Sequence, residues 1–212
     1  MKRKTYYPVF LNLEGKNIIV VGGGRVAERK VLSLIKTGAD ITVISPQITR
    51  RLEREVIKGK IKHVPREYNK KSDIKNAFLT IAATDSKEIN RKVSQDACCL
   101  INVVDSPHLC NFIVPSIVKR GHLTIAVSTN GISPALSKTI RKELQRFYKP
   151  AFSGYLRLLE KIRKNAIEKI KDRRKRSRLL KSIASERIIK TLRKKGLKEV
   201  RKTLNSLHIS PK

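Results

Sequence analysis

The chain has 212 residues, of which 49 are Lys or Arg and 17 are Asp or Glu, so its formal net charge is +32. This length exceeds the usual domain size of about 100–150 residues, which predicts an α/β domain followed by a smaller unit. No apolar run approaches the roughly 20 residues that span a bilayer, the N-terminus lacks the apolar core of a secretion signal, and the three cysteines fit neither a disulfide framework nor a zinc site, so we expect a cytoplasmic protein.

A glycine triplet follows the first predicted strand. Residues 16–21 are rich in β-branched side chains and run into Gly22-Gly23-Gly24, after which a helix is expected to begin. The spacing of Gly22, Gly24 and Ala27 fits the dinucleotide fingerprint, in which glycines let the backbone approach a pyrophosphate and the helix N-terminus attracts its charge. A second strand at 41–44 completes a βαβ unit of about thirty residues.

The end of this second strand carries no acidic residue. In the dinucleotide fold an Asp or Glu at this point binds the ribose 2′-hydroxyl, whereas this chain has Ser45-Pro46-Gln47. Arg50 and Arg51 follow one turn further on and would tolerate a 2′-phosphate. The sequence therefore leaves the choice between NAD and NADP open.

Strands and helices continue to alternate up to residue 104. We expect a helix at 48–57, strands at 61–64 and 78–83, a helix at 89–97 and a strand at 100–104. This alternation predicts a doubly wound, Rossmann-like parallel sheet in an α/β domain at 1–113. Its carboxyl edge would carry the glycine triplet, Ser45, Thr84, Asp85 and Asp105. Thr84 and Asp85 are also candidates for capping the following helix.

The pattern changes after residue 113. We expect one strand at 123–128, a turn, and an amphipathic helix at 135–148. One strand and one helix cannot bury both of their faces. Residues 114–149 are therefore predicted to be a dimerisation segment that completes its sheet with a second copy of the chain.

From residue 150 to 212 the sequence predicts a basic, all-helical C-terminal domain. Apolar residues recur there at helical spacing, with a break at 171–176, and residues 151–212 hold 21 basic and five acidic residues. This excess is typical either of a solvated surface or of a contact with a polyanion. An alternative function is therefore a nucleotide-sensing or nucleic-acid-binding protein that uses the basic tail.

Several strings, taken in order, resemble one family. They are Tyr7-Pro8-Val9-Phe10-Leu11, the segment 21–30, Ala82-Ala83-Thr84-Asp85, Asn102-Val103-Val104-Asp105, Leu109-Cys110-Asn111-Phe112, Pro115-Ser116-Ile117 and the segment 130–135. Over residues 6–148 they resemble the precorrin-2 dehydrogenase and sirohydrochlorin ferrochelatase family of siroheme synthesis. The methyltransferase domain of the fused siroheme synthases lies outside this resemblance.

The resemblance implies an activity and partners. Precorrin-2 would be oxidised to sirohydrochlorin with NAD as hydride acceptor, and bifunctional members also insert Fe²⁺ as a substrate. A homodimer formed through 114–148 is implied as well. The tetrapyrrole substrates of this family carry eight carboxylate arms, so a basic cleft would attract them.

The resemblance also assigns site residues. The family's key aspartate falls on Asp105, a candidate base for the proton released on oxidation, although an Asx-type turn is the alternative. The implied cofactor contacts are Gly22, Gly24, Arg25, Val26, Pro46, Gln47, Thr84 and Asp85. Ser128, Thr129 and Asn130 fall at the family's substrate cleft or form an ordinary turn. No metal ligands are assigned: we expect His108 on the surface, rather than as a second acid/base or iron ligand, and Cys110 in packing.

Overall fold

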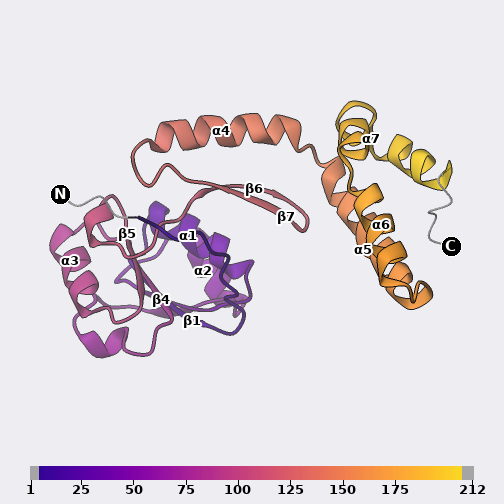
Figure 1. The fold of residues 1–212 in the computed structure, drawn as a ribbon. Coiled ribbons are helices and arrows are strands. Elements are labelled where there is room, and N and C mark those ends of the chain that lie inside the picture. The colour runs from indigo at the N-terminus through magenta and orange to yellow at the C-terminus, as the bar shows by residue number, and fades with distance from the viewer. Residues whose placement is uncertain (1–4, 207–212) are drawn as a thin grey trace. The chain divides into compact units, whose positions relative to one another are not determined.

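The computed structural model describes residues 5–206 (Figure 1). The chain divides into two compact units, with the boundary between Val114 and Pro115. The first unit contains the predicted Rossmann-like domain. The further boundary expected between 149 and 150 stays a prediction.

A five-stranded parallel sheet forms the centre of the first unit. Its strands are β1 (Asn17–Val21), β2 (Asp40–Ile44), β3 (Lys62–Val64), β4 (Leu79–Ala82) and β5 (Leu100–Val103), and they lie in the order β3-β2-β1-β4-β5. The predicted doubly wound sheet is confirmed. Because the strand order reverses between β1 and β4, a crevice opens at their carboxyl ends, where such sheets bind ligands.

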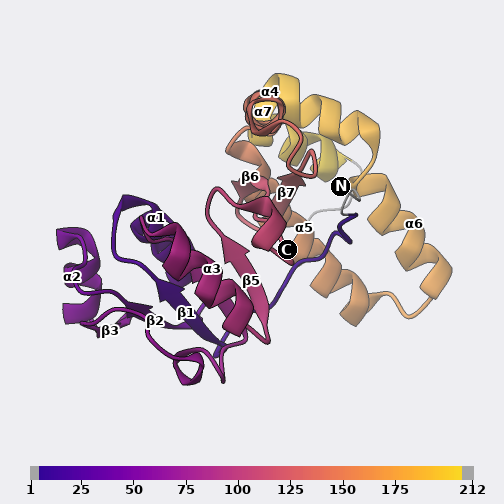
Figure 2. The ribbon, with the colours of Figure 1, turned by 90° about the vertical axis from the view of Figure 1, so that its left-hand side faces the viewer.

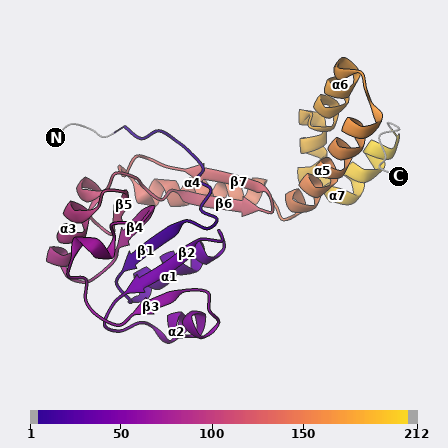
Figure 3. The same cartoon turned by 90° about the horizontal axis from the view of Figure 1, so that it is seen from below.

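Helices cover both faces of this sheet. They are α1 (Arg25–Ile35), α2 (Arg50–Ile57) and α3 (Lys87–Asp96), with short 3₁₀ turns η1 (Lys71–Asp73) and η2 (Pro107–Leu109). Ile18 and Val20 pack in one core cluster with residues of α1 and α2, whereas Ile19 and Val21 pack in a second cluster with Val93 of α3. Figure 3 shows α3 on one side of the strands and α1 with α2 on the other. This arrangement explains why β1 is apolar at consecutive positions.

The second unit begins with a hairpin that the sequence interpretation missed. Strand β6 (Ser116–Arg120) pairs antiparallel with β7 (Leu123–Val127), and helix α4 (Pro134–Phe147) packs on the pair (Figure 1). The expectation of a single strand was wrong because only Val118 of β6 is buried and the strand ends in two basic residues. Since β6 supplies a pairing partner for β7, a second copy is not needed for that purpose.

Helices follow, as the sequence predicts. They are α5 (Ala151–Lys169), α6 (Arg173–Ile183) and α7 (Glu186–Ser206), drawn from orange to yellow in Figure 2, and α7 is kinked at Gly196. Helix α6 begins inside the run in which we placed the break, because the Asp172 side chain accepts hydrogen bonds from the backbone N–H groups of Arg174 and Lys175. None of the helices among residues 5–206 has the length and apolarity to cross a membrane.

Candidate functional site

The glycine triplet lies between β1 and α1, and its three members differ in their surroundings. Gly22 has a φ of +115°, and a Cβ there would lie 2.3 Å from the Ala83 carbonyl oxygen. A Cβ at Gly23 would lie 1.9 Å from the Gln47 carbonyl oxygen. A Cβ at Gly24 would meet nothing within 4 Å. The first two glycines therefore permit tight backbone packing, and the third keeps open the space above the turn.

The N-terminus of α1 faces this open space without a side-chain cap. Gly24 is the N-cap residue and supplies no side chain to bind the N–H groups of the first turn. Such uncapped N–H groups, together with the helix dipole, form a binding site for an anion. The turn therefore fits the pyrophosphate of a dinucleotide.

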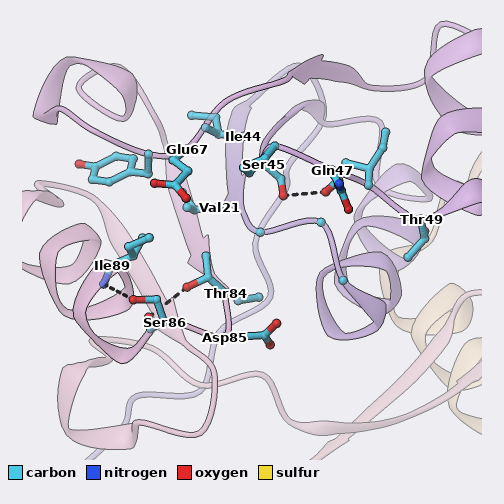
Figure 4. Close-up of a pocket in the computed structure, with 17 residues that line it drawn as sticks. Val21, Ile44, Ser45, Gln47, Thr49, Glu67, Thr84, Asp85, Ser86 and Ile89 are labelled. Carbon is cyan, nitrogen blue, oxygen red and sulfur yellow. Dashed lines mark hydrogen bonds between the residues drawn. The ribbon is translucent and has the colours of Figure 1, made fainter.

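A pocket of about 510 Å³ adjoins the turn (Figure 4). It is lined by the ends of β1, β2 and β4, by the start of α3, and by Glu67 and Tyr68 from the loop after β3. Six of the eight predicted cofactor residues line it, namely Gly22, Gly24, Pro46, Gln47, Thr84 and Asp85. The other two do not: Arg25 is exposed, and Val26 packs partly against the core under α1.

Thr84 is held at the pocket wall by Asn90 of α3. The Thr84 backbone N–H and hydroxyl both donate to Asn90 Oδ1, at 3.2 and 2.8 Å, and Asn90 Nδ2 donates to the Thr84 carbonyl at 2.9 Å. The cap of α3 is Ser86, whose hydroxyl accepts from the Ile89 N–H at 3.2 Å. The alternative that Thr84 or Asp85 caps this helix is therefore wrong.

The loop after β2 is shaped by its own polar groups. The Ser45 hydroxyl donates to the Gln47 carbonyl at 2.7 Å, and a ring nitrogen of His63 lies 2.9 Å from the Ser45 carbonyl oxygen. Neither Arg50 nor Arg51 lines the pocket. The Arg51 guanidinium instead lies 3.9 Å from the Glu28 carboxylate.

Asp105 lies at the same edge of the sheet, directly after β5. Ala82 and Val103 are paired in register, so the residues after β4 and those after β5 emerge side by side. Asp105 is exposed and has a φ of +57°, in the left-handed region. Within residues 5–206 its carboxylate accepts no hydrogen bond, so the Asx-type turn is not formed.

The thiol of Cys110 forms hydrogen bonds with the backbone on both sides of Asp105. Cys110 is buried in the cluster beside α3, and its Sγ accepts from the Val103 N–H at 3.1 Å while lying 3.4 Å from the Ser106 carbonyl, to which it donates. Packing, as predicted for Cys110, is thus combined with hydrogen bonding that shapes the Asp105 turn. Sequence spacing gives no sign of this contact, because it depends on the 3₁₀ turn η2 that lies between Ser106 and Cys110.

Lys30 of α1 carries a charge that acts on Asp105, and the sequence predicts no functional role for this lysine. Burial is the main cause that lowers the pKa of Lys30, and the positive charge of Arg29 lowers it further. The negative charge of Asp105 is the smallest of the contributions and acts in the opposite direction. A partly buried cation therefore accompanies the proposed base.

The predicted substrate residues lie in the second unit, in the turn before α4. The Thr129 hydroxyl accepts from the Ser133 N–H at 3.0 Å, the Ser128 hydroxyl accepts from the Asn130 N–H at 3.0 Å, and Asn130 has a φ of +53°. These are contacts of an ordinary turn. A substrate role for the three residues stays a prediction.

Metal-ligating side chains do not gather elsewhere in the part of the chain that the structure describes. Between residues 5 and 206 no group of three or more His, Cys, Asp or Glu side chains is placed to hold a metal ion. His108 is exposed in η2, as expected.

Two family models match the chain. Residues 9–116 match the family described as "Putative NAD(P)-binding", and residues 120–146 match the central part of sirohaem biosynthesis proteins. Together the two matches follow the division of the described chain, since the first covers the parallel sheet and the second covers most of the hairpin and α4.

Curated relatives point in the same direction. The siroheme synthase of Thioalkalivibrio sulfidiphilus is 39% identical over 176 residues, which cover 82% of this chain and 36% of that protein. The siroheme synthase of Methylobacillus flagellatus is 42% identical over 152 residues, covering 70% and 32%, respectively. The chain thus spans about a third of the length of these relatives.

A solved structure matches over nearly the whole chain. It is described as SirC, precorrin-2 dehydrogenase, and it is 27% identical with a TM-score of 0.82, covering 97% of this chain and 100% of that chain. The similarity therefore includes the helical C-terminal region, which the sequence resemblance over 6–148 did not reach. These comparisons give no support to the alternative of a nucleic-acid-binding protein.

Proposed function

The chain belongs to the NAD(P)-binding family of siroheme synthases and precorrin-2 dehydrogenases, and from this membership we propose that it oxidises precorrin-2 to sirohydrochlorin with NAD as the hydride acceptor. The observation that carries the proposal is the placement of two features at one sheet edge. A glycine turn with an uncapped helix N-terminus lies after β1, and a carboxylate lies after β5.

The chemistry needs a hydride acceptor and a base. NAD, when bound, accepts a hydride from the substrate carbon. The Asp105 carboxylate takes the proton that the substrate loses in the same oxidation, so two electrons and two hydrogens leave in balance. Exposure of Asp105 leaves its oxygens free to reach a substrate, and Cys110 fixes the backbone turn from which it projects.

The test is the formation of NADH from precorrin-2, followed at 340 nm with the purified chain. We expect turnover with wild type and a loss of at least about 100-fold with Asp105→Ala, because removing a general base typically costs 10²–10⁴-fold in rate. Asp40→Ala serves as the matched control, since Asp40 is an exposed carboxylate at the opposite edge of the sheet. Normal turnover by Asp105→Ala would remove Asp105 from the mechanism.

Ferrochelatase activity is a separate question that a second assay answers. Bifunctional members of the family also insert Fe²⁺, and we propose that the same carboxylate would accept protons from pyrrole nitrogens during metal entry. Sirohydrochlorin is incubated with Fe²⁺ or Co²⁺ and no NAD, and its absorption spectrum is followed. Metal insertion that Asp105→Ala abolishes would assign both activities to one site.

We also propose that the chain works as a homodimer in the cytoplasm. The second unit exposes several apolar side chains around α4, with Ile132, Leu136 and Phe147 exposed to 64%, 51% and 56%. Their burial between two copies is the expected reason. Sedimentation equilibrium of wild type and of a Leu136→Glu, Phe147→Glu double variant tests this, with a shift to monomer expected for the variant.

A further inference from the structure

The charges in the pocket differ sharply from those of the chain. Among its 17 lining residues Glu67 and Asp85 are acidic and none is basic, although the whole chain has 49 Lys and Arg residues. The lining groups that can bind a phosphate are therefore neutral: backbone N–H groups at the start of α1, with the helix dipole, and hydroxyl or amide side chains. A second phosphate group, beyond the reach of that helix N-terminus, would find no lining cation.

The acidic residue that dinucleotide folds carry after the second strand is absent here, but a carboxylate reaches the pocket from the next loop. Ser45 occupies the position of that acidic residue, and its hydroxyl donates a hydrogen bond to the Gln47 carbonyl. Glu67 follows β3, which pairs directly with β2. In Figure 4 the Glu67 side chain is seen near Val21 and Ile44, the last residues of β1 and β2. Glu67 is thus a carboxylate near the carboxyl ends of these two strands.

The backbone of Glu67 is held on both sides. Before it, Arg66 donates two hydrogen bonds to Asp73, at 2.9 and 2.8 Å, and the Asp73 side chain is only 4% exposed. After it, the buried Tyr68 donates its hydroxyl to Asp96 at 2.7 Å. A planar two-bond ion pair and a buried tyrosine are both rigid anchors.

The Glu67 carboxylate itself is uncommitted. Its backbone carbonyl accepts from Arg66, but among residues 5–206 its side chain has no hydrogen bond or ion pair. The loop therefore presents a free acceptor to the pocket from a fixed backbone position. The anchors of the two neighbouring residues limit how far this acceptor can move away.

We propose that Glu67 is the residue that binds the ribose hydroxyls of the adenosine half and selects NAD over NADP. This inference rests on the proposed NAD-dependent function. A carboxylate accepts hydrogen bonds from the 2′- and 3′-hydroxyls of NAD, whereas the 2′-phosphate of NADP adds a charge of nearly −2. With no basic residue in the lining, that charge would face Glu67 without compensation.

The experiment measures binding of NAD⁺ and NADP⁺ separately by isothermal titration calorimetry, without any tetrapyrrole. We expect wild type to bind NAD⁺ at least about tenfold more tightly than NADP⁺, and Glu67→Gln to reduce that ratio about tenfold, the size of one charged hydrogen bond. Glu67→Lys should invert the preference. Glu14→Gln is the matched control, because Glu14 is exposed in the turn before β1 and its loss changes net charge equally.

The outcomes separate this inference from the proposed function. Failure of wild type to bind either dinucleotide would refute both. NAD⁺ binding with a ratio that Glu67→Gln leaves unchanged would refute the role of Glu67 alone. Thermal unfolding of each variant confirms that it is folded, and we expect Glu67→Gln to unfold at the wild-type temperature because its carboxylate has no partner among the described residues.

Discussion

The contrast between Gly23 and Gly24 gives the sharpest test of the pocket. An added Cβ at Gly23 would lie 1.9 Å from the Gln47 carbonyl oxygen and 2.8 Å from Ser45 Oγ. Relief requires a shift of about 1 Å in one of two backbone segments that are also joined by the hydrogen bond from the Thr49 N–H to the Gly23 carbonyl, at 3.1 Å. Overpacking of this kind costs about 1–3 kcal/mol, so we expect Gly23→Ala to destabilise the first unit by about 3 kcal/mol.

Gly24→Ala should behave in the opposite way. Its φ of −77° suits alanine, and a Cβ there meets nothing within 4 Å. Exchange of an N-cap glycine for alanine costs less than about 1 kcal/mol, so the fold should remain. The methyl group would occupy the space that we assign to the pyrophosphate, and a loss of about 2 kcal/mol, or about 30-fold in Kd, is expected for NAD⁺.

Differential scanning calorimetry and NAD⁺ titration measure the two effects separately. For a unit of this size, 1 kcal/mol corresponds to about 4 °C, so Gly23→Ala should lower the unfolding temperature by about 12 °C and Gly24→Ala by less than about 4 °C. Wild-type NAD⁺ affinity in Gly24→Ala would show that the dinucleotide does not pass over this glycine. Wild-type stability in Gly23→Ala would refute the close backbone approach.

Three further predictions concern stability. Asn90→Ala removes three hydrogen bonds to Thr84 in a buried position, and we expect a loss of about 2–3 kcal/mol in urea unfolding, together with weaker NAD⁺ binding. The hydrogen bond from Arg66 holds the pKa of Asp73 below its ordinary value of 3.8. The ionised Asp73 therefore stabilises the fold fully above pH 3.8, and this stabilisation is lost as the pH falls through the lower pKa of the folded state. Asp73→Asn should remove this part of the acid unfolding transition, which is followed by circular dichroism. Burial raises the pKa of Tyr155 to about 12 from 10, so the neutral phenol stabilises the fold fully below pH 10 and this stabilisation is lost as the pH rises through about 12. The stability of the C-terminal helices should therefore fall less steeply with rising alkaline pH in Tyr155→Phe than in wild type. An unchanged dependence of stability on pH would contradict this role of Tyr155.

The parallel sheet could be predicted from the sequence because its strands are short apolar runs. Strand β4 is buried at all four positions, and β1 at four of five. Each strand can therefore be predicted from a continuous apolar run, without an alternating pattern of apolar and polar residues. The glycine spacing then located the turn, because only glycine, which has no Cβ, tolerates the positive φ and the close backbone contacts that this turn requires. Gly22 and Gly24 line the pocket for this reason, whereas Pro46, Gln47, Thr84 and Asp85, which also line it, were predicted from the family resemblance.

What the sequence did not reveal depends on contacts between distant segments. Strand β6 has one buried residue among five, so its pattern resembles a loop, and only its pairing with β7 defines it. Glu67 lies in a polar stretch without a motif, and its position follows from the anchoring of Arg66 and Tyr68 by residues 7 and 28 positions away along the chain. Such tertiary constraints leave no local signal.

The absence of lysine and arginine from the pocket lining has a consequence for how the chain's surface can vary. If the cofactor phosphates are bound by neutral groups and the α1 dipole, as we propose, their binding does not require a contact with any of the 49 Lys and Arg residues of the chain. We therefore expect substitutions of basic residues on the exterior to change the affinity for the dinucleotide little. Adding salt should accordingly weaken capture of a polycarboxylate substrate far more than it weakens binding of NAD⁺.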